Sequence, residues 1–336
     1  MRAQRILVTG ADGFLGRGLV QALATRQDAP AVVAADLREV PADRRLPGTT
    51  YLRWDVRDAG MAAVLATHGI DTVVHLASIV TPGKGSTRAL EYAVDVGGTR
   101  QVLDACLAQG VRHLIVSSSG AAYGYHADNP DWLTEEHPLR GNESFAYAHH
   151  KRLVEEMLAE ARRQHPPLAQ TVFRIGTILG ERVDNQITAL FEKPRPLAIA
   201  GSNSPFVFIW DEDVCGALLH ALDGDGPPGC YNLAGDGALT IHAIAERLGK
   251  RPLVLPAGLL RTALRVGRAL GVSRYGPEQL DFLRYRPVLL NTALKERFGY
   301  MPRKTSAQAF DAFVAARSAQ GRSLAARASD LPERRA

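Results

Sequence analysis

The 336-residue chain carries a net charge of +5 at neutral pH, with 46% apolar and 22% charged residues. This composition is ordinary for a globular protein and predicts one large α/β domain with a smaller annex. No apolar run approaches the roughly 20 residues of a membrane span, and the basic residues are spread along helices rather than clustered with aromatic ones, so neither a membrane nor a nucleic-acid partner is expected.

The start of the chain and its cysteines favour a cytoplasmic location. Residues 1–5 lead directly into an apolar strand, which leaves no room for a signal peptide. Cys106, Cys215 and Cys230 have neither metal-ligand spacing nor the pattern of a disulfide framework. We therefore expect reduced cysteines and no metal site.

The first strand, at residues 6–8, ends in a glycine-rich turn that precedes a helical pattern running to residue 26. Such a turn brings bare backbone close to a pyrophosphate at the N-terminus of a helix. Its spacing differs by one residue from the common G-x-G-x-x-G, so an ordinary tight turn is the alternative. The candidate cofactor-binding residues here are Gly10, Asp12, Gly13, Phe14, Leu15 and Gly16.

The next two strands end in acidic residues. The strand at residues 31–35 is followed by Asp36, which can accept hydrogen bonds from the adenosine ribose and would repel a 2′-phosphate. This favours NAD over NADP, although Arg38 can weaken the preference. A third strand, at residues 51–54, ends at Asp55 and Val56, a candidate contact for the adenine edge.

Two more strands, at residues 70–76 and 113–116, flank a helix predicted over residues 86–109. Strands that alternate with helices in this way predict a doubly wound parallel sheet, a Rossmann fold. The first strand leads through Leu76 into Ala77 and Ser78, and the second leads into Ser119 and Gly120. Ligands bind at the carboxyl ends of such strands.

Tyr147 and Lys151 are four residues apart, so on a helix they lie on one face. A phenol normally titrates near ~10, and a nearby ammonium favours the phenolate. The pair is therefore a candidate acid/base centre, although many solvated helices carry the same spacing.

Together these motifs resemble the extended short-chain dehydrogenase/reductase family, in its NAD-dependent epimerase/dehydratase group. The resemblance covers residues 4 to 315. It is carried by Thr9-Gly10, Gly13, Gly16, Asp36, Asp55-Val56, His75-Leu76-Ala77, the serine run with Tyr123-Gly124, Tyr147, Lys151, Arg174, Gly180, Glu212-Asp213-Val214, Tyr231-Asn232-Leu233 and residues 294–302.

The resemblance implies an NAD cofactor and a role for each matched residue. Tyr147 would be the acid/base, Lys151 would bind the nicotinamide ribose and favour the phenolate, and Ser119 would hydrogen-bond the substrate oxygen. Arg174 is placed with the cofactor-binding residues. His149 and His150 are interpreted as surface or packing residues. A homodimer is implied, formed through the helix of Tyr147 and the helix before it.

Departures from the family's pattern narrow the chemistry. Gly120 and Ala121 stand where dehydratases carry Asp-Glu, which makes a 4,6-dehydratase unexpected. Phe206 replaces an arginine that grips a phosphate in sugar-nucleotide epimerases, and the usual Arg-Pro-Gly-Asp signature is missing. A substrate pocket of Ser78, Ser119, Gly120, Phe206 and Phe208, with Trp210 nearby, would favour an uncharged, apolar substrate, unless these aromatic residues belong to the core.

Asp95 stands where the family tends to place an Asn. A charge at this position either alters the proton relay or only caps or bends the helix.

We expect a Rossmann domain at residues 1–175, to which parts of 205–235 return, a substrate lobe at 176–317 and a mobile tail at 318–336. The basic amphipathic stretch 259–270 is interpreted as a lobe helix with arginines facing water, with membrane association as the alternative. The predicted activity is hydride transfer between NAD and a secondary alcohol or ketone that is not a nucleotide sugar. The alternatives are a sugar-nucleotide epimerase and a non-catalytic NAD-binding sensor or scaffold.

Overall fold

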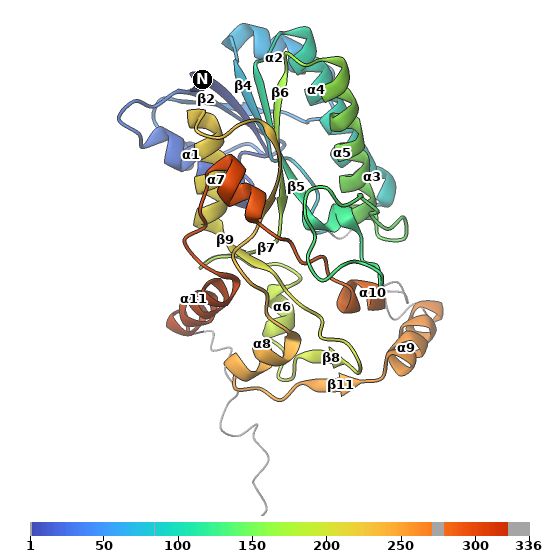
Figure 1. Ribbon diagram of the computed structural model, residues 1–336. Helices are drawn as coiled ribbons and strands as arrows, with labels where there is room; N and C mark the ends of the chain where they lie inside the picture. Colours follow the sequence, from blue (N-terminus) through green and yellow to red (C-terminus); the bar gives the residue numbers. More distant parts are fainter. Residues whose placement is uncertain (1, 84, 271–278, 322–336) are drawn as a thin grey trace, which may run out of the picture.

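A computed structural model of the chain describes residues 2–83, 85–270 and 279–321. Its centre is a seven-stranded sheet of strand order β10-β6-β5-β4-β1-β2-β3 in which every neighbouring pair is parallel (Figure 1). This confirms the predicted doubly wound sheet. The strands are β1 Arg5–Thr9, β2 Ala31–Asp36, β3 Thr49–Arg53, β4 Thr72–His75, β5 His113–Ser119, β6 Ala169–Ile175 and β10 Gly229–Leu233.

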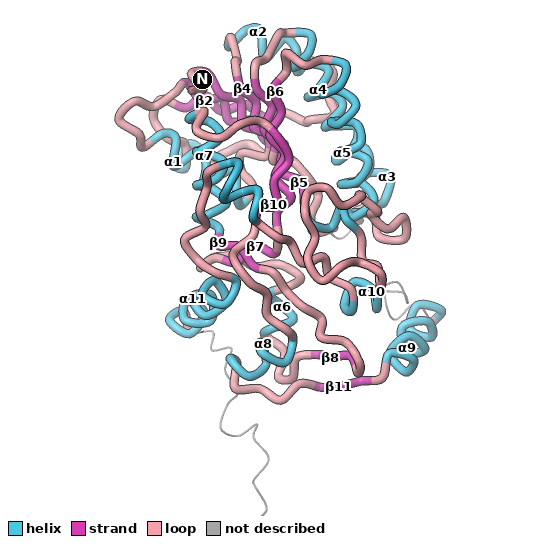
Figure 2. Tube along the Cα trace, viewed as in Figure 1, coloured by secondary structure: helices cyan, strands magenta, loops and turns pink. Residues whose placement is uncertain are grey.

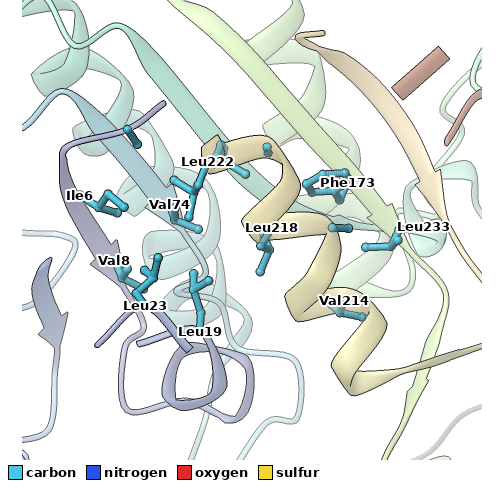
Figure 3. Close-up of a cluster of buried hydrophobic side chains, with 14 of the residues drawn as sticks. Ile6, Val8, Leu19, Leu23, Val74, Phe173, Val214, Leu218, Leu222 and Leu233 are labelled. Carbon is cyan, nitrogen blue, oxygen red and sulfur yellow. The ribbon is translucent and has the colours of Figure 1, made fainter. Parts of the chain in front are cut away.

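Helices cover both faces of this sheet, which explains why its central strands are apolar almost throughout. One face is covered by α1 Phe14–Ala24 and α7 Asp211–Asp223, whose leucines pack on β1 and β4 (Figure 3). The other is covered by α2 Met61–His68, α4 Thr99–Ala108 and α5 Ala146–Gln164. All four residues of β4 are buried.

The helix predicted over residues 86–109 is present without a gap, as α3 Arg88–Tyr92, a π-helical stretch Ala93–Gly98, and α4. Gly98 packs so closely that a Cβ there would lie 2.7 Å from Cγ2 of Val56. Thr99 Oγ1 donates to the carbonyl of Asp95, 2.5 Å away. Wide turns of this kind are frequent at functional sites, and this one carries Asp95.

A smaller lobe lies beyond the carboxyl edge of the sheet (Figure 2). It contains the parallel pairs β7–β9 and β8–β11 and a core of phenylalanines. Its elements are β7 Thr177–Leu179, α6 Thr188–Phe191, β8 Leu197–Ile199, β9 Phe208–Trp210, α8 Ile241–Arg247, β11 Leu253–Leu255, α9 Ala257–Ala269, α10 Gln279–Arg284 and α11 Ser306–Ala319.

The basic amphipathic stretch forms α9, which buries none of its residues. Arg261 and Arg265 are exposed, as expected for arginines that face water. Within the described residues, no helix has the length and apolarity needed to cross a bilayer. The tail predicted from residue 318 overlaps the end of α11, and residues 322–336 lie outside the described residues.

Candidate active site

The sheet and the lobe enclose a cavity of about 270 Å³. The three predicted catalytic residues line it together, although they come from β5 and α5. The predicted pocket residues Ser78, Gly120 and Phe206 also line it. The cavity therefore brings together residues that are more than a hundred positions apart in the sequence.

Lys151 and Tyr147 face each other across one turn of α5. The Lys151 ammonium lies 5.6 Å from the centre of the Tyr147 ring and donates a hydrogen bond to the carbonyl of Ser117, 3.0 Å away. Ser119 ends β5, and its hydroxyl oxygen accepts the N–H of Ala121 at 3.2 Å. The hydroxyl keeps its own proton to donate to a substrate oxygen.

The glycine-rich turn forms a cradle before α1. Gly10 has a φ of +68°, and a Cβ there would lie 2.7 Å from the backbone nitrogen of Ala77. A Cβ at Gly16 would overlap the carbonyl of Gly10. The N-terminus of α1, at Gly13, has no side-chain cap and no acidic residue in its first turn. Its free N–H groups and positive dipole end therefore fit a pyrophosphate.

Asp36, at the end of β2, lies against this cradle. Its carboxylate accepts the backbone N–H groups of Asp12, at 2.9 Å, and Arg38, at 3.0 Å. The buried side chain of Asp12 lies 3.4 Å from Arg38 and 3.3 Å from Arg44. The residues present thus fit a dinucleotide. Asp55, beyond β3, is paired with Arg57, whose hydrogen bonds hold the pKa of Asp55 below its usual value despite partial burial.

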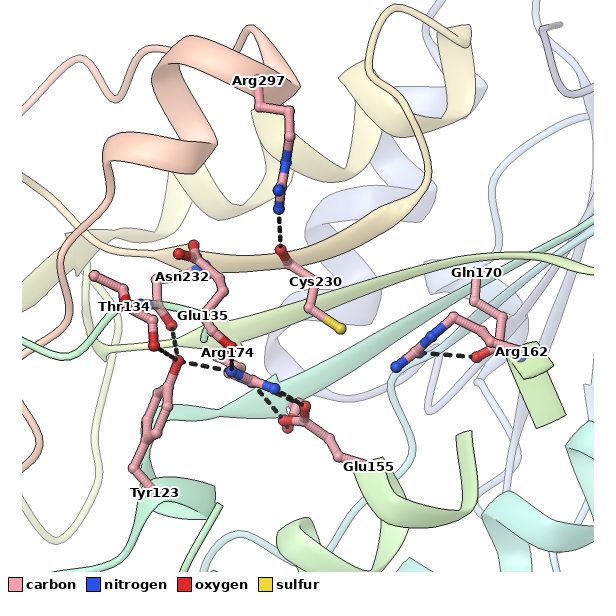
Figure 4. A network of polar contacts seen from close by, with 11 residues as sticks. Tyr123, Thr134, Glu135, Glu155, Arg162, Gln170, Arg174, Cys230, Asn232 and Arg297 are labelled. Carbon is pink, nitrogen blue, oxygen red and sulfur yellow. Dashed lines mark hydrogen bonds and ion pairs between the residues drawn. The ribbon is translucent and has the colours of Figure 1, made fainter. Parts of the chain in front are cut away.

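Arg174, predicted among the cofactor-binding residues, lies in a buried polar network and does not line this cavity (Figure 4). Its guanidinium lies 2.8 Å from the carboxylate of Glu155 and donates to the hydroxyl of Tyr123 at 2.7 Å. Burial acts to lower the pKa of Arg174, but the charge of Glu155, the Tyr123 hydroxyl and the hydrogen bonds to both together outweigh it and raise that pKa. Arg174 therefore fixes α5 to β6.

Phe208 is also misplaced by the sequence analysis. It is fully buried and stacks on Phe206 and Phe310 in the core of the lobe, and Trp210 is buried in the same cluster. Positions 206, 208 and 210 are two residues apart and so share one face, and that face packs into the core of the lobe. Of this aromatic group, Phe206 alone lines the cavity within the described residues.

The sequence analysis missed Arg286, whose side chain lines the cavity. Its guanidinium carbon lies 4.1 Å from the ring centre of Phe206 and 4.4 Å from that of Phe282. Its Nε and Nη2 atoms are inaccessible and have no hydrogen-bond partner within the described residues. The sequence feature that could have identified this residue is the pair Arg286-Pro287. This pair is the first half of the family's Arg-Pro-Gly-Asp signature, whose second half is absent here.

The two histidines of α5 lie in different surroundings. His150 is buried against Asp95, whereas His149 is partly exposed. In the described part of the chain, no cluster of three or more His, Cys, Asp or Glu side chains could hold a metal ion.

The family model described as NAD dependent epimerase/dehydratase family matches residues 6–234. The chain belongs to this family. The resemblance to the NAD-dependent epimerase/dehydratase group that the motifs predict is therefore confirmed, and with it the prediction of an enzyme.

Relatives of this NAD dependent epimerase/dehydratase family member include an uncharacterised protein of Mycobacterium tuberculosis, 28% identical over 93% of this chain and 84% of that protein. A UDP-glucose 4-epimerase of Erwinia amylovora is 29% identical over 54% of this chain and 56% of that protein.

Among solved structures, a Thermotoga maritima UDP-glucose 4-epimerase with UDP-glucose superposes with a TM-score of 0.72 at 20% identity, covering 94% of this chain and 99% of that one. An Agrobacterium tumefaciens short-chain dehydrogenase/reductase superfamily protein with bound NAD gives 0.72 at 22% identity, covering 94% and 98%. At these identities the likeness shows a shared fold.

Proposed function

We propose that the protein is an NAD-dependent epimerase that acts on a sugar carrying a phosphate group, with a sugar nucleotide as the substrate class. The observation that carries this proposal is Arg286, a cation in the cavity wall whose Nε and Nη2 atoms have no hydrogen-bond partner among the described residues. The proposal reverses the preference drawn from Phe206 and agrees with the activity named for the relatives from Erwinia amylovora and Thermotoga maritima.

The charge on Arg286 argues for an anionic substrate. Burial lowers its pKa to about 10, which still leaves the guanidinium protonated at neutral pH. A buried cation without a partner is unfavourable unless an anion completes it. Arginine donates in a planar fork that suits phosphate oxygens. A substrate phosphate would supply the missing acceptors.

The residues of the cavity can then handle the proton. Tyr147 takes the proton of the substrate hydroxyl, Lys151 favours the phenolate that makes this possible, and Ser119 donates to the same substrate oxygen. The cradle of Gly10, Gly13 and Gly16 would hold NAD, which would supply the hydride chemistry at the carbon. Tyr147 gives the proton back after the ketone has turned its other face to the cofactor. The configuration of that carbon is thereby inverted.

A second candidate, net oxidation or reduction of an apolar alcohol or ketone, is favoured by one observation. Phe206 lines the cavity where the family's phosphate-binding arginine would stand, and Phe145, Tyr125 and Phe282 line it too. Such rings contribute apolar contact area to a ligand. Under this reading NADH accumulates with turnover, whereas an epimerase shows no net change of cofactor.

A thermal-shift experiment separates the two. NAD-loaded protein is heated with and without UDP or UDP-glucose; a ligand at about a hundred times its Kd adds ~2.7 kcal/mol of stability. We expect a clear rise in Tm for the wild type that Arg286→Gln loses while its response to NAD remains.

The matched control is Arg284→Gln, because Arg284 stacks on Tyr285 and does not line the cavity. It should keep both responses. If the wild type responds to NAD but to neither UDP nor UDP-glucose, the sugar-nucleotide proposal is wrong and the apolar candidate takes its place.

Preference for NAD over NADP and a homodimer paired through α5 remain predictions. The dimer prediction is supported by Leu90 and Tyr92, large apolar side chains of α3 that are 36% and 47% exposed.

A further inference from the structure

Asp95 and His150 form a buried pair beside the proposed catalytic residues. Both side chains are 1% exposed, and Nδ1 of His150 lies 3.3 Å from Oδ2 of Asp95. Asp95 lies in the π-helical stretch, and His150 immediately precedes Lys151 on α5. The pair therefore joins the two helical segments that flank the cavity.

Three donors converge on the Asp95 carboxylate. Oδ1 accepts the hydroxyl of Ser78 at 2.9 Å and the backbone N–H of Ile79 at 2.9 Å, while Oδ2 faces His150. Burial acts to raise the pKa of Asp95, but the bond with His150, the Lys151 ammonium and these donors outweigh it and hold the pKa below its usual value. Asp95 is therefore a buried anion.

The surroundings of His150 indicate a neutral imidazole. Its Nε2 atom is inaccessible and has no hydrogen-bond partner within the described residues. An imidazolium would bury a second N–H donor without an acceptor, which is unfavourable. The proton on Nδ1, donated to Asp95, satisfies the observed contact, because the bond made by one ring nitrogen selects the tautomer.

Among the described groups around the pair, Lys151 is the cation whose charge helps to lower the pKa of Asp95. His75, on β4, lies between Thr9 and Thr99, and burial lowers its pKa to about 3, so it is neutral. From α3, the ring of Tyr92 meets the imidazole nearly at right angles, with ring centres 5.6 Å apart. On α5, His149 is partly exposed and lies beside Arg152. Partial burial, and to a lesser extent the charge of Arg152, lower the pKa of His149, so this histidine adds no charge at neutral pH.

We propose that Asp95, oriented by His150, is a positioning residue for the reaction. Its carboxylate holds Ser78 in the cavity wall and acts as a fixed counter-charge to the Lys151 ammonium. An Asn at this position would offer the shape without the charge. This counter-charge weakens the effect of the Lys151 ammonium on Tyr147.

The proposal rests on the proposed role of Tyr147, and its test does not need a substrate. Ring-labelled tyrosine NMR of the NAD-loaded protein follows the titration of Tyr147, whose signal is assigned by its absence from Tyr147→Phe. We expect Asp95→Asn to move the titration midpoint to lower pH by about half a unit or more. His150→Asn, which keeps a donor near Nδ1, should stay close to the wild type, and so should the neighbouring control His149→Ala.

A second measurement covers the case in which Asp95→Asn does not fold. Nitrogen NMR of the wild-type protein at neutral pH should show His150 neutral with its proton on Nδ1. An imidazolium there would cancel the charge of Asp95 and overturn the proposal. So would an Asp95→Asn variant that folds and leaves the midpoint unchanged, since Asp95 would then only support the structure. Full turnover by Tyr147→Phe would instead refute the proposed function itself.

Discussion

At the scale of single residues, Asp36 is the expected source of cofactor preference. We predict that Asp36→Ala raises the efficiency with NADP relative to NAD by about tenfold, which corresponds to ~1.4 kcal/mol. The carboxylate that repels a 2′-phosphate is removed, while Arg38 and Arg44 remain nearby. The measurement is kcat/KM, or Kd from a thermal shift, with each cofactor.

Asp43→Ala is the control, because Asp43 is an exposed acid a few residues away. It should leave the ratio unchanged. An unchanged ratio in Asp36→Ala as well would show that Asp36 does not select the cofactor.

Residues whose role follows from backbone geometry could be predicted from the sequence. Gly10 needs a positive φ and close packing, and Tyr147 and Lys151 need only helical spacing to meet. Phe208 was placed in the pocket because the sequence does not say which way a side chain faces once strands from distant positions pack together. Arg286 was missed for the same reason, although its Arg-Pro pair was visible.

At the scale of secondary-structure elements, the Glu155–Arg174 pair links α5 to β6. We predict that Glu155→Ala lowers the free energy of unfolding by about 3–5 kcal/mol, because it leaves the Arg174 guanidinium buried and unpaired. Ser118 also loses its acceptor. Chemical denaturation followed by circular dichroism measures the change.

The adjacent Glu156 is the matched control. Its ion pair with Arg152 lies at the surface, so Glu156→Ala should change stability by only about 0–1 kcal/mol. Equal effects of the two substitutions would contradict the assigned role of Glu155.

The helix that contains Asp95 shows why some elements escape prediction. Periodicity favours one continuous helix over residues 86–109, and the π-helical stretch depends on contacts from elsewhere in the chain. Gly98 packs on Val56, and Asp95 binds the loop after β4. No local sequence pattern indicates these contacts with Val56 and with the loop after β4.

At the scale of the whole molecule, buried histidines make the free energy of unfolding depend on pH. Burial lowers the pKa of His75 to about 3, with Lys151 adding to the effect and Asp95 opposing it. The unfolded chain takes up this proton near pH ~6.5 and the native protein does so only near pH 3. Stability should therefore fall as the pH drops below about 6.5, by up to ~1.4 kcal/mol per pH unit for this group.

We predict that His75→Gln makes the loss of stability between about pH 6 and pH 4 less steep than in the wild type. Denaturation midpoints over this range measure the slope. His113, whose pKa burial lowers to about 4, offers an independent variant with the same expected direction. The exposed His242→Gln should leave the slope unchanged, and an unchanged slope in His75→Gln would contradict the assignment.

The doubly wound parallel sheet could be predicted from the sequence, because each strand and turn has its own local pattern. The lobe was not: its short strands pair across long separations, as β8 does with β11, and its core is built from β9, α6 and α11. The balance between apolar and anionic substrates depends on that packing, which places Phe206 and Arg286 on the same wall.

The central claim is that Tyr147 handles the proton while NAD carries the hydride. The most direct measurement is interconversion of UDP-glucose by NAD-loaded protein, followed by NMR together with NADH absorbance, in the wild type, Tyr147→Phe and the control Tyr285→Phe. The account predicts epimerisation without net NADH, a rate about 10²–10⁴-fold lower in Tyr147→Phe with its thermal response to NAD intact, and a normal rate in Tyr285→Phe. Equal turnover by Tyr147→Phe and the wild type would contradict it.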